Sequence, residues 1–332
     1  MRVAMYYNNR DVRLEEMPLP KISAGELLVK VMASGICGSD VMEWYRLKRA
    51  PLVLGHEATG EIVEAGKDVK GYKNGDRVFV SHHVPCNTCR YCLSGNHTVC
   101  ETLHTTNYYP GGFAEYIRVP KINVERGVFL LPEEISFEEG TFIEPLACVL
   151  RAQKMVNLKA GQSVLILGAG ISGLLHLLLS RVQGVKQVTV TDINDFRLKL
   201  AKELGASSAL NAKDEKVTNL KADLVIVCTG ATAAFEQALK CVDRAGTILC
   251  FAATEPGVGL CVPVNDFWRN SIKIMHSYGA SPQDIREAIE LLEKKSIPVE
   301  KLITHRLSLK EAGQGFKLVA KAADCLKVIL IP

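Results

Sequence analysis

The sequence predicts an α/β protein that combines a β-rich part with a doubly wound parallel sheet. Two observations predict this fold class. Short alternating or apolar runs fill the first 150 residues, separated by Gly, Asn, Asp and Pro, and this pattern is typical of β-strands. From about Gln162 onward, apolar β-branched runs alternate with helix-like segments, which indicates a parallel sheet with both faces covered.

The individual elements follow from the same patterns. In the β-rich part we expect strands at 27–33, 60–64 and 77–81. In the second part we expect strands in SVLILG, QVTVTD, DLVIVCTG and GTILCFA, with helices such as FRLKLAKELG and TAAFEQALKCV between them. The segment after Ser281 predicts two helical stretches and a last strand, LKVILI.

Composition and charge narrow the class of protein. The 332 residues carry 40 basic and 36 acidic side chains, with no run of like charges, so we expect neither a nucleic-acid nor a membrane partner. The N-terminal MRVAMYYNNR lacks the apolar stretch of a signal peptide. The apolar stretch 164–182 contains glycines, His176 and Arg181, and we interpret it as a strand followed by a helix. These observations predict a soluble cytoplasmic protein.

A glycine-rich loop follows the strand SVLIL and precedes a leucine-rich helix, as a dinucleotide-binding loop requires. Its cofactor-binding candidates are Gly168, Gly170, Ile171, Ser172 and Gly173. Asp192 ends the next strand, 19 residues beyond Gly173, where a carboxylate can bind the ribose hydroxyls and repel a 2′-phosphate. This arrangement favours NAD over NADP; the alternative is an ordinary α/β turn. Arg197 is a candidate for contact with the adenine, or a solvated helix residue.

The chain has eleven cysteines, and four of them, Cys86, Cys89, Cys92 and Cys100, lie within fifteen residues. Clustered thiols in a reducing compartment indicate metal binding. Four thiolates leave no open coordination position, so this segment, the cysteine lobe (86–100), predicts a structural zinc site. An iron–sulfur cluster, which also uses four cysteines, is the alternative.

A second set of ligand-type residues is dispersed along the chain: Cys37, His56, Glu57 and Glu144. One thiolate, one imidazole and carboxylates form a plausible catalytic zinc site with room for water or substrate. Each residue also has a simpler explanation, as a packed thiol, a loop histidine or a helix N-terminal acid.

With these residues assembled, the sequence resembles the zinc-dependent medium-chain alcohol dehydrogenases, and within them the polyol branch of sorbitol, galactitol-phosphate and threonine dehydrogenases. The motifs GICGSD, GHEATGEIVEAG, GDRV, GGFAEY, EPLA and GAGISG occur in the family's order, together with the cysteine lobe. The resemblance implies a GroES-like catalytic domain at 1–151 and 281–332, and a Rossmann NAD-binding domain at 152–280. It also implies a homodimer or homotetramer.

The resemblance assigns roles to single residues. Cys37 and His56 become ligands of a catalytic zinc, and Glu57 a ligand or a close acid. Glu144 takes the place of a second cysteine ligand and binds zinc directly or through water. Ser39 carries away the proton of the alcohol. Many relatives end this relay in a histidine three residues after the serine, but here that position is Met42; the relay must end in water, the ribose hydroxyls or Glu144.

The implied reaction is the NAD-linked oxidation of a secondary alcohol of a polyol or sugar alcohol, with two zinc ions per chain. Threonine or a phosphorylated sugar alcohol is the alternative substrate, and Arg46, Lys48 and Arg49 could supply a phosphate site. A third possibility is an NAD-binding scaffold without catalysis. Joint retention of the zinc-site residues argues against it.

Overall fold

The structure is a computed structural model that describes residues 1–332 with every side chain except those of Glu215 and Thr218. The chain divides into two compact units. One consists of Met1–Ala147 together with Ala280–Pro332, and the other of Cys148–Gly279. We call them the split unit and the inserted unit, because the second interrupts the first in sequence.

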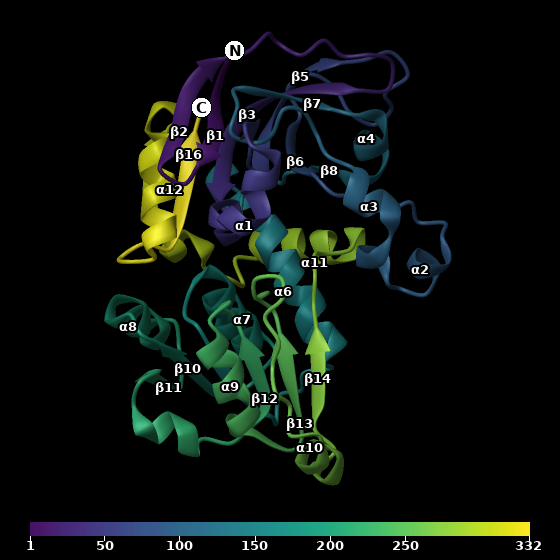
Figure 1. The fold of residues 1–332 in the computed structure, drawn as a ribbon. Coiled ribbons are helices and arrows are strands. Elements are labelled where there is room, and N and C mark those ends of the chain that lie inside the picture. The colour runs from purple at the N-terminus through teal and green to yellow at the C-terminus, as the bar shows by residue number, and fades with distance from the viewer. The chain divides into compact units, whose positions relative to one another are not determined.

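The inserted unit is built on a six-stranded parallel sheet, whose strands β10, β11, β12, β13 and β14 are labelled in Figure 1. Its strand order is β11-β10-β9-β12-β13-β14, so the direction of winding reverses between β9 and β12. The strands are β9 (Ser163–Leu167), β10 (Gln187–Asp192), β11 (Ser208–Asn211), β12 (Ala222–Val227), β13 (Val242–Cys250) and β14 (Lys273–His276). This is the doubly wound order of dinucleotide-binding domains, and it confirms the predicted fold class.

Helices connect these strands: α7 (Ile171–Val182), α8 (Asp195–Glu203), α9 (Thr232–Cys241) and α10 (Val264–Asn270). Because parallel crossovers are right-handed, α7 and α8 cover one face of the sheet and α9 and α10 the other. Leu165, Val225 and Ile248 pack in the core beneath α9. The connection from β11 to β12 holds only a 3-10 turn, η4 (Glu215–Asn219).

The split unit is mainly antiparallel. Its larger sheet has the order β15-β16-β3-β5-β6-β8, with β7 paired to β3. The strands are β3 (Leu27–Ile36), β5 (Glu57–Ala65), β6 (Arg77–Ser81), β7 (Tyr116–Val119), β8 (Val128–Leu130), β15 (Ile303–Ser308) and β16 (Lys327–Ile331). Two registers matter for the site: Gly35 of β3 pairs with Glu57 of β5, and Ile36 pairs with Val328 of β16.

A three-stranded sheet, β2-β1-β4, completes the strands of the split unit: β1 (Arg2–Asn8), β2 (Asp11–Glu16) and β4 (Leu52–Val53). Its helices are α1 (Glu43–Arg46), α2 (Arg90–Leu93), α3 (Glu101–Thr105), α4 (Lys121–Gly127), α5 (Phe137–Gly140), α11 (Pro282–Glu293) and α12 (Ala312–Lys321). Helix α6 (Ile143–Met155) carries the chain from the split unit into the inserted unit. The remaining 3-10 turns are η1 (Gly38–Val41), η2 (Leu47–Arg49), η3 (His97–Val99), η5 (Val299–Leu302) and η6 (Leu309–Glu311).

The core of the split unit is formed where the strands of each sheet turn apolar side chains inward. Tyr6, Phe113 and Phe316 pack in one cluster, and Val29, Ile62 and Ile117 in another. The apolar stretch 164–182 is β9, the glycine loop and α7, as the sequence predicts. Within the described residues, every helix is too short or too polar to cross a bilayer.

Candidate metal centres and nucleotide loop

The four cysteines of the cysteine lobe lie together. Their sulfur atoms all lie within 4.8 Å of one another. The Cys86–Cys92 and Cys89–Cys92 sulfur separations are 3.9 and 3.6 Å. Tetrahedral zinc with bonds of about 2.3 Å holds its ligand sulfurs about 3.8 Å apart. The lobe therefore fits a single zinc ion, and sulfurs this close leave no room for a cluster of several irons.

The backbone of the lobe points N–H groups at these sulfurs. The N–H groups of Thr88 and Cys89 donate to Cys86 Sγ at 3.4 and 3.2 Å, and that of Cys86 donates to Cys100 Sγ at 3.3 Å. Hydrogen bonds from Thr88 and Cys89 lower the pKa of the Cys86 thiol to about 5. Burial and the neighbouring thiols raise the pKa of Cys92 to about 12. A cation is therefore needed to ionise all four sulfurs together.

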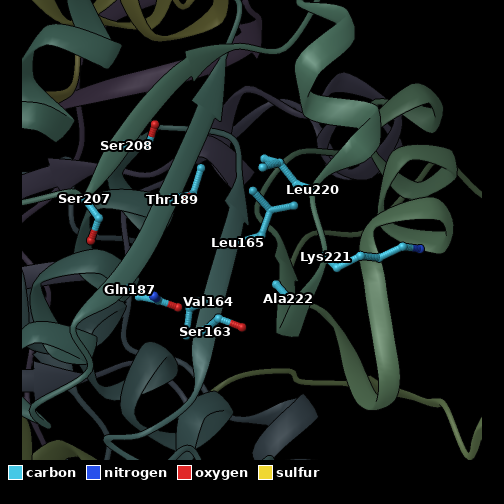
Figure 2. Close-up of a pocket in the computed structure, with 10 residues that line it drawn as sticks. All are labelled: Ser163, Val164, Leu165, Gln187, Thr189, Ser207, Ser208, Leu220, Lys221 and Ala222. Atoms are coloured by element: carbon cyan, nitrogen blue, oxygen red, sulfur yellow. The ribbon is translucent and has the colours of Figure 1, made fainter.

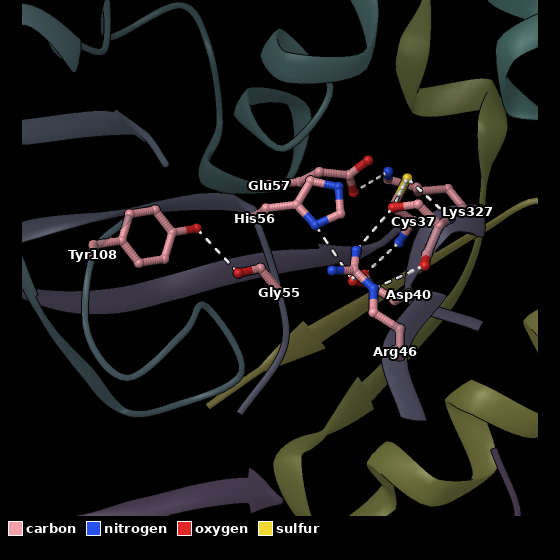
Figure 3. Close-up of polar contacts among 9 residues, drawn as sticks. Cys37, Asp40, Arg46, Gly55, His56, Glu57, Tyr108 and Lys327 are labelled. Atoms are coloured by element: carbon pink, nitrogen blue, oxygen red, sulfur yellow. Dashed lines mark hydrogen bonds and ion pairs between the residues drawn. The ribbon is translucent and has the colours of Figure 1, made fainter. Parts of the chain in front are cut away.

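A second group of ligand atoms comes from two neighbouring strands. Cys37 follows the last residue of β3, His56 precedes β5, and Glu57 is the first residue of β5. Because β3 and β5 pair with Gly35 opposite Glu57, the ends of the two strands bring the three side chains together. Their ligand atoms all lie within 4.8 Å of one another. We call these three residues the ligand trio; Figure 3 shows them converging. The thiolate, imidazole and carboxylate suit zinc and leave a coordination position open.

Asp40 contacts two members of the ligand trio, Cys37 and His56. Its carboxylate is fully buried, accepts the N–H of Cys37 at 3.1 Å and lies 3.3 Å from His56 Nδ1. Because Nδ1 is engaged, Nε2 is left to bind a metal. Burial would lower the pKa of His56, but the charges of Asp40 and Cys37 outweigh it and raise that pKa well above its usual value. Burial opposes ionisation of Asp40, yet His56 and Arg46 lower its pKa.

Glu57 is held by a lysine from the far end of the sequence. Lys327, the first residue of β16, donates from Nζ to Glu57 Oε2, and both side chains are only 1% exposed. The lysine also lies 5.2 Å over the ring of Phe142. A β-carbon at Gly35 would overlap both partners, so glycine is needed there. Sequence reasoning missed Lys327; its only signal was a lone lysine opening an apolar strand.

Ser39 lies beside the ligand trio, in the 3-10 turn η1. Its hydroxyl donates to Cys37 Sγ at 3.5 Å. Arg46 donates from Nη2 to Ser39 Oγ at 3.1 Å and from Nε to the Ser39 carbonyl oxygen at 3.0 Å. Met42 ends this turn and precedes α1. The hydroxyl therefore has polar neighbours on two sides.

Glu144 lies in the first turn of α6, half-buried, and is not one of the ligand trio. Glu144 acts on the buried Tyr108, whose hydroxyl donates to the Gly55 carbonyl at 3.3 Å. Burial raises the pKa of Tyr108 well above its usual value, and the charges of Asp40, Glu144 and Glu57 raise it further. Glu144 therefore belongs to the same acidic surroundings as the trio.

Two histidines that show no ligand spacing in the sequence also pack at this site. The ring of His82 lies 5.0 Å from that of His56, and the ring of His83 lies 3.8 Å from that of His82. Burial and the neighbouring positive groups lower the pKa of His83 to about 4, and that of His82 falls well below its usual value. Both histidines are therefore neutral near pH 7.

The glycine loop follows β9 at the point where the strand order reverses. Gly168 has φ +106°, a conformation that glycine adopts without strain. A β-carbon at Gly173 would overlap the Gly168 carbonyl oxygen, so the start of α7 packs closely against the loop. Ile171 and Ser172 form the first turn of α7. The loop thus has the geometry of a pyrophosphate-binding turn.

Asp192 and Arg197 lie next to this loop. The Asp192 carboxylate accepts the N–H of Ala169 at 2.7 Å and that of Asn194 at 2.9 Å. Each oxygen keeps a second lone-pair position for a ribose hydroxyl. Nη1 of Arg197, on α8, would lie 3.8 Å from a β-carbon at Gly170. Both residues therefore border the space in front of the loop.

A cavity of ≈ 250 Å³ lies elsewhere in the inserted unit. Figure 2 shows it along the starts of β9, β10 and β12, where Ser163, Gln187 and Ala222 stand. The glycine loop follows the opposite, carboxyl end of β9. The cavity is therefore separate from the nucleotide loop.

Two family models match the chain. The model of the alcohol dehydrogenase GroES-like domain matches residues 23–132, and the model of zinc-binding dehydrogenases matches residues 172–294. The sorbitol dehydrogenase of Bacillus subtilis (strain 168) is 31% identical over 352 residues, covering 100% of this chain and 97% of the relative. The L-threonine 3-dehydrogenase of Chelativorans sp. (strain BNC1) is 31% identical over 335 residues, covering 96% and 94%.

Solved structures match over the same length. Galactitol-1-phosphate dehydrogenase from Escherichia coli superposes with a TM-score of 0.87, at 29% identity, and the match covers 100% of each chain. Among the other matching structures, one is bound to NADP and one is complexed with NADH.

Proposed function

The chain belongs to the zinc-dependent medium-chain alcohol dehydrogenases, in their polyol dehydrogenase branch, and we propose that it oxidises a secondary alcohol of a polyol or sugar alcohol to the ketone with NAD. The observation that carries the proposal is the ligand trio, with an open coordination position and the Ser39 hydroxyl beside it. A site that served only structure would be closed, like the cysteine lobe.

The ligand trio would hold the catalytic zinc, with Glu144 as a further ligand or the partner of a bound water. When bound, zinc acts as a Lewis acid at the alcohol oxygen. Ser39 then takes the proton of the substrate hydroxyl and passes its own to water, a ribose hydroxyl or Glu144. The nicotinamide, when bound, would accept a hydride from the carbinol carbon, and the overall products would be ketone, reduced cofactor and one proton.

The inserted unit would bind the cofactor. The glycine loop (Gly168–Gly173) would face the pyrophosphate, Asp192 would accept the ribose hydroxyls, and Arg197 would contact the adenine. The Asp192 carboxylate favours NAD, because a 2′-phosphate would meet its negative charge. The split unit would then be the catalytic domain and the inserted unit the NAD-binding domain.

The cysteine lobe would hold a second, structural zinc, giving two ions per chain. Thiolate ligands at both centres suit the reducing cytoplasm. We further propose a homodimer or homotetramer, because β14 is an edge strand of the inserted unit's sheet and an unpaired edge strand needs covering.

The first test is NADH formation by zinc-replete protein across sorbitol, xylitol, galactitol, their phosphates, threonine and simple alcohols. A chelator-treated sample and the Cys37→Ser variant serve as metal-site controls, and Cys241→Ser, a buried thiol of the inserted unit, as the matched cysteine control. We expect chelator-sensitive reduction of NAD with a polyol, lost in Cys37→Ser and retained in Cys241→Ser. Folded, zinc-loaded protein that forms no NADH with any substrate would contradict the proposal.

The cofactor assignment has its own test. Asp192→Ala removes two charge-assisted hydrogen bonds and the repulsion of a 2′-phosphate, so NAD should bind at least about tenfold more weakly and the preference should move toward NADP. Cofactor titrations monitored by fluorescence would measure both affinities. An unchanged preference would remove Asp192 from the ribose site.

A further inference from the structure

Arg46 makes two hydrogen bonds to Ser39 that the sequence did not predict. The family's relay histidine is replaced by Met42, yet an arginine from α1, four residues further on, reaches back to Ser39. Its Nη2 donates to the hydroxyl oxygen at 3.1 Å and its Nε to the carbonyl oxygen at 3.0 Å. The Arg46 side chain therefore donates hydrogen bonds to both oxygens of Ser39.

The donors and acceptors of the two side chains determine where the Ser39 hydroxyl proton can point. A guanidinium has five N–H donors, no acceptor, and keeps its proton in proteins. A serine hydroxyl has one proton and two lone pairs. Arg46 takes one lone pair of Ser39, and the hydroxyl proton cannot point back at Arg46. The proton is directed instead to Cys37 Sγ, at 3.5 Å, on the side of the ligand trio.

Arg46 itself is held in one place. Its Nη2 lies 3.3 Å from Asp40 Oδ1, and Asp40 is fully buried. Its guanidinium carbon lies 4.6 Å from the centre of the Tyr45 ring, and its side chain is only 17% exposed. Figure 3 shows Arg46 directed at Asp40, which in turn reaches His56. A fixed guanidinium excludes its own direction for the proton of the hydroxyl that it contacts and leaves the other directions, one of which meets Cys37 Sγ.

The same contacts decide between two roles for this arginine. An anchor for a phosphorylated substrate would direct its N–H groups into the space that the substrate occupies. Two of the three nitrogens of Arg46 are instead committed to Ser39 and Asp40. That is the arrangement of a residue that acts through Ser39.

We propose that Arg46 is a positioning residue that orients the Ser39 hydroxyl, leaving its proton and one lone pair on the side of the ligand trio. It takes the place of the absent histidine in shaping the relay without accepting a proton itself. The inference rests on the proposed function for its catalytic consequence, but the orientation of the hydroxyl can be measured without turnover.

The kinetic test is a double-mutant cycle. Arg46→Met should lower kcat about 10–100-fold, as removal of a residue that supports a metal-site group does, with KM changed less than about twofold. In the Ser39→Ala background the same substitution should change kcat less than about twofold. Arg46→Lys keeps one donor and should restore part of kcat. Equal losses in both backgrounds, or a loss confined to KM for phosphorylated substrates, would overturn the proposal.

The second test needs no substrate. Protein loaded with Co²⁺ has thiolate-to-cobalt charge-transfer bands, whose energy depends on hydrogen bonds to the thiolate. Ser39→Ala and Arg46→Met should shift the Cys37 component in the same direction, and the double variant should shift no further than Ser39→Ala. A wild-type spectrum in Arg46→Met would overturn the proposal. If the wild-type protein turned over no substrate, the proposed function would fail and this measurement would still decide the role of Arg46.

Arg13→Met is the matched control for both tests. Like Arg46, Arg13 pairs with an aspartate, Asp11, and lies 4.6 Å over a tyrosine ring, that of Tyr7. It lies on β2, outside the ligand trio and its supports. We expect wild-type kcat and a wild-type cobalt spectrum. Zinc content should match wild type in every variant. Arg46→Met should still unfold in one cooperative transition, at a lower temperature because the buried Asp40 loses one of its partners. A loss of zinc on Arg46→Lys as well as Arg46→Met would mean that the arginine only maintains the fold.

Discussion

The two units of the molecule differ in what they bury. Among the side chains that the structure describes, the charged residues that are fully enclosed all belong to the split unit: Asp40, Glu57, Asp284 and Lys327. The enclosed polar residues of the inserted unit are Gln153, His176, Ser180 and Thr191. Of these only His176 can ionise, and burial lowers its pKa to about 3, which leaves it neutral.

This difference follows the chemistry of each unit. A buried charge is costly unless it is paired, and apolar residues would stabilise the fold as well or better. Asp284 caps α11. The other three contact the ligand trio or belong to it. The split unit therefore retains buried charge where the proposed catalytic zinc and its ligands would need it. The inserted unit instead keeps Asp192 half-buried at the carboxyl end of β10.

The largest effect should come from breaking the buried ion pair. Lys327→Met leaves Glu57 enclosed without its partner, which should cost about 3–5 kcal/mol of unfolding free energy. Urea denaturation would measure it. Lys295→Met, which breaks an exposed pair with Glu139, is the control and should cost less than about 1 kcal/mol. Adding Glu57→Gln to Lys327→Met should recover most of the loss; equal losses in the two lysine variants would remove the distinction between buried and surface charge.

The next largest effect concerns the cysteine lobe, whose thiolate charge a zinc ion would balance. Cys92→Ser removes one of four thiolates, so the lobe should bind zinc more than about 100-fold more weakly, equivalent to about 3 kcal/mol. Zinc content should fall by one ion per chain, and the melting temperature should fall with it. Cys241→Ser replaces a buried thiol that donates to the Val217 carbonyl at 3.2 Å and should keep full zinc content. Full zinc retention in Cys92→Ser would show that the lobe is not a four-thiolate site.

A smaller effect is expected from the neutral network of the inserted unit. The side-chain amide of Gln153 lies 3.1 Å from His176 Nδ1 and 3.0 Å from Ser180 Oγ. Gln153→Leu leaves these groups without that partner, which should cost about 1–3 kcal/mol. Urea denaturation under the conditions used for Lys327→Met allows direct comparison. A loss as large as that of Lys327→Met would contradict the contrast between the units.

The smallest effect is a dependence on pH. The pKa of His176 is about 3 in the folded protein and about 6.5 when unfolded, so the unfolded state binds the extra proton between these values. Its contribution to stability is therefore complete above pH 6.5 and is lost as the pH falls. Between pH 6.5 and 5.5, wild type should lose about 1 kcal/mol more than His176→Leu. Identical pH profiles would show that His176 does not bear this proton linkage.

The sequence predicted features that depend on neighbours in the chain. The glycine loop, the cysteine lobe and the strands around β9 carry their signals within a few residues. The residue types of the ligand trio suggested a zinc site, but no spacing in the sequence joined them and the resemblance assigned their roles, because Cys37 and His56 meet through strand pairing. Other features depend on tertiary contacts that no local spacing marks. These are the ion pair of Lys327, the packing of His82 against His83, and the hydrogen bonds from Arg46 to Ser39. Strand β14 gave no strong apolar signal, because most of its side chains are exposed.

The pairing of Glu57 with Lys327 spans 270 residues, and this span sets the order in which a nascent chain can complete its two candidate metal centres. The cysteine lobe has all its ligands once Cys100 has emerged from the ribosome. The ligand trio is also synthesised early, but the counter-charge of Glu57 arrives with β16, among the last residues made. At about 5–20 residues per second the interval is tens of seconds. During synthesis, the cysteine lobe therefore has its complete set of ligands long before the ligand trio has the counter-charge of Glu57.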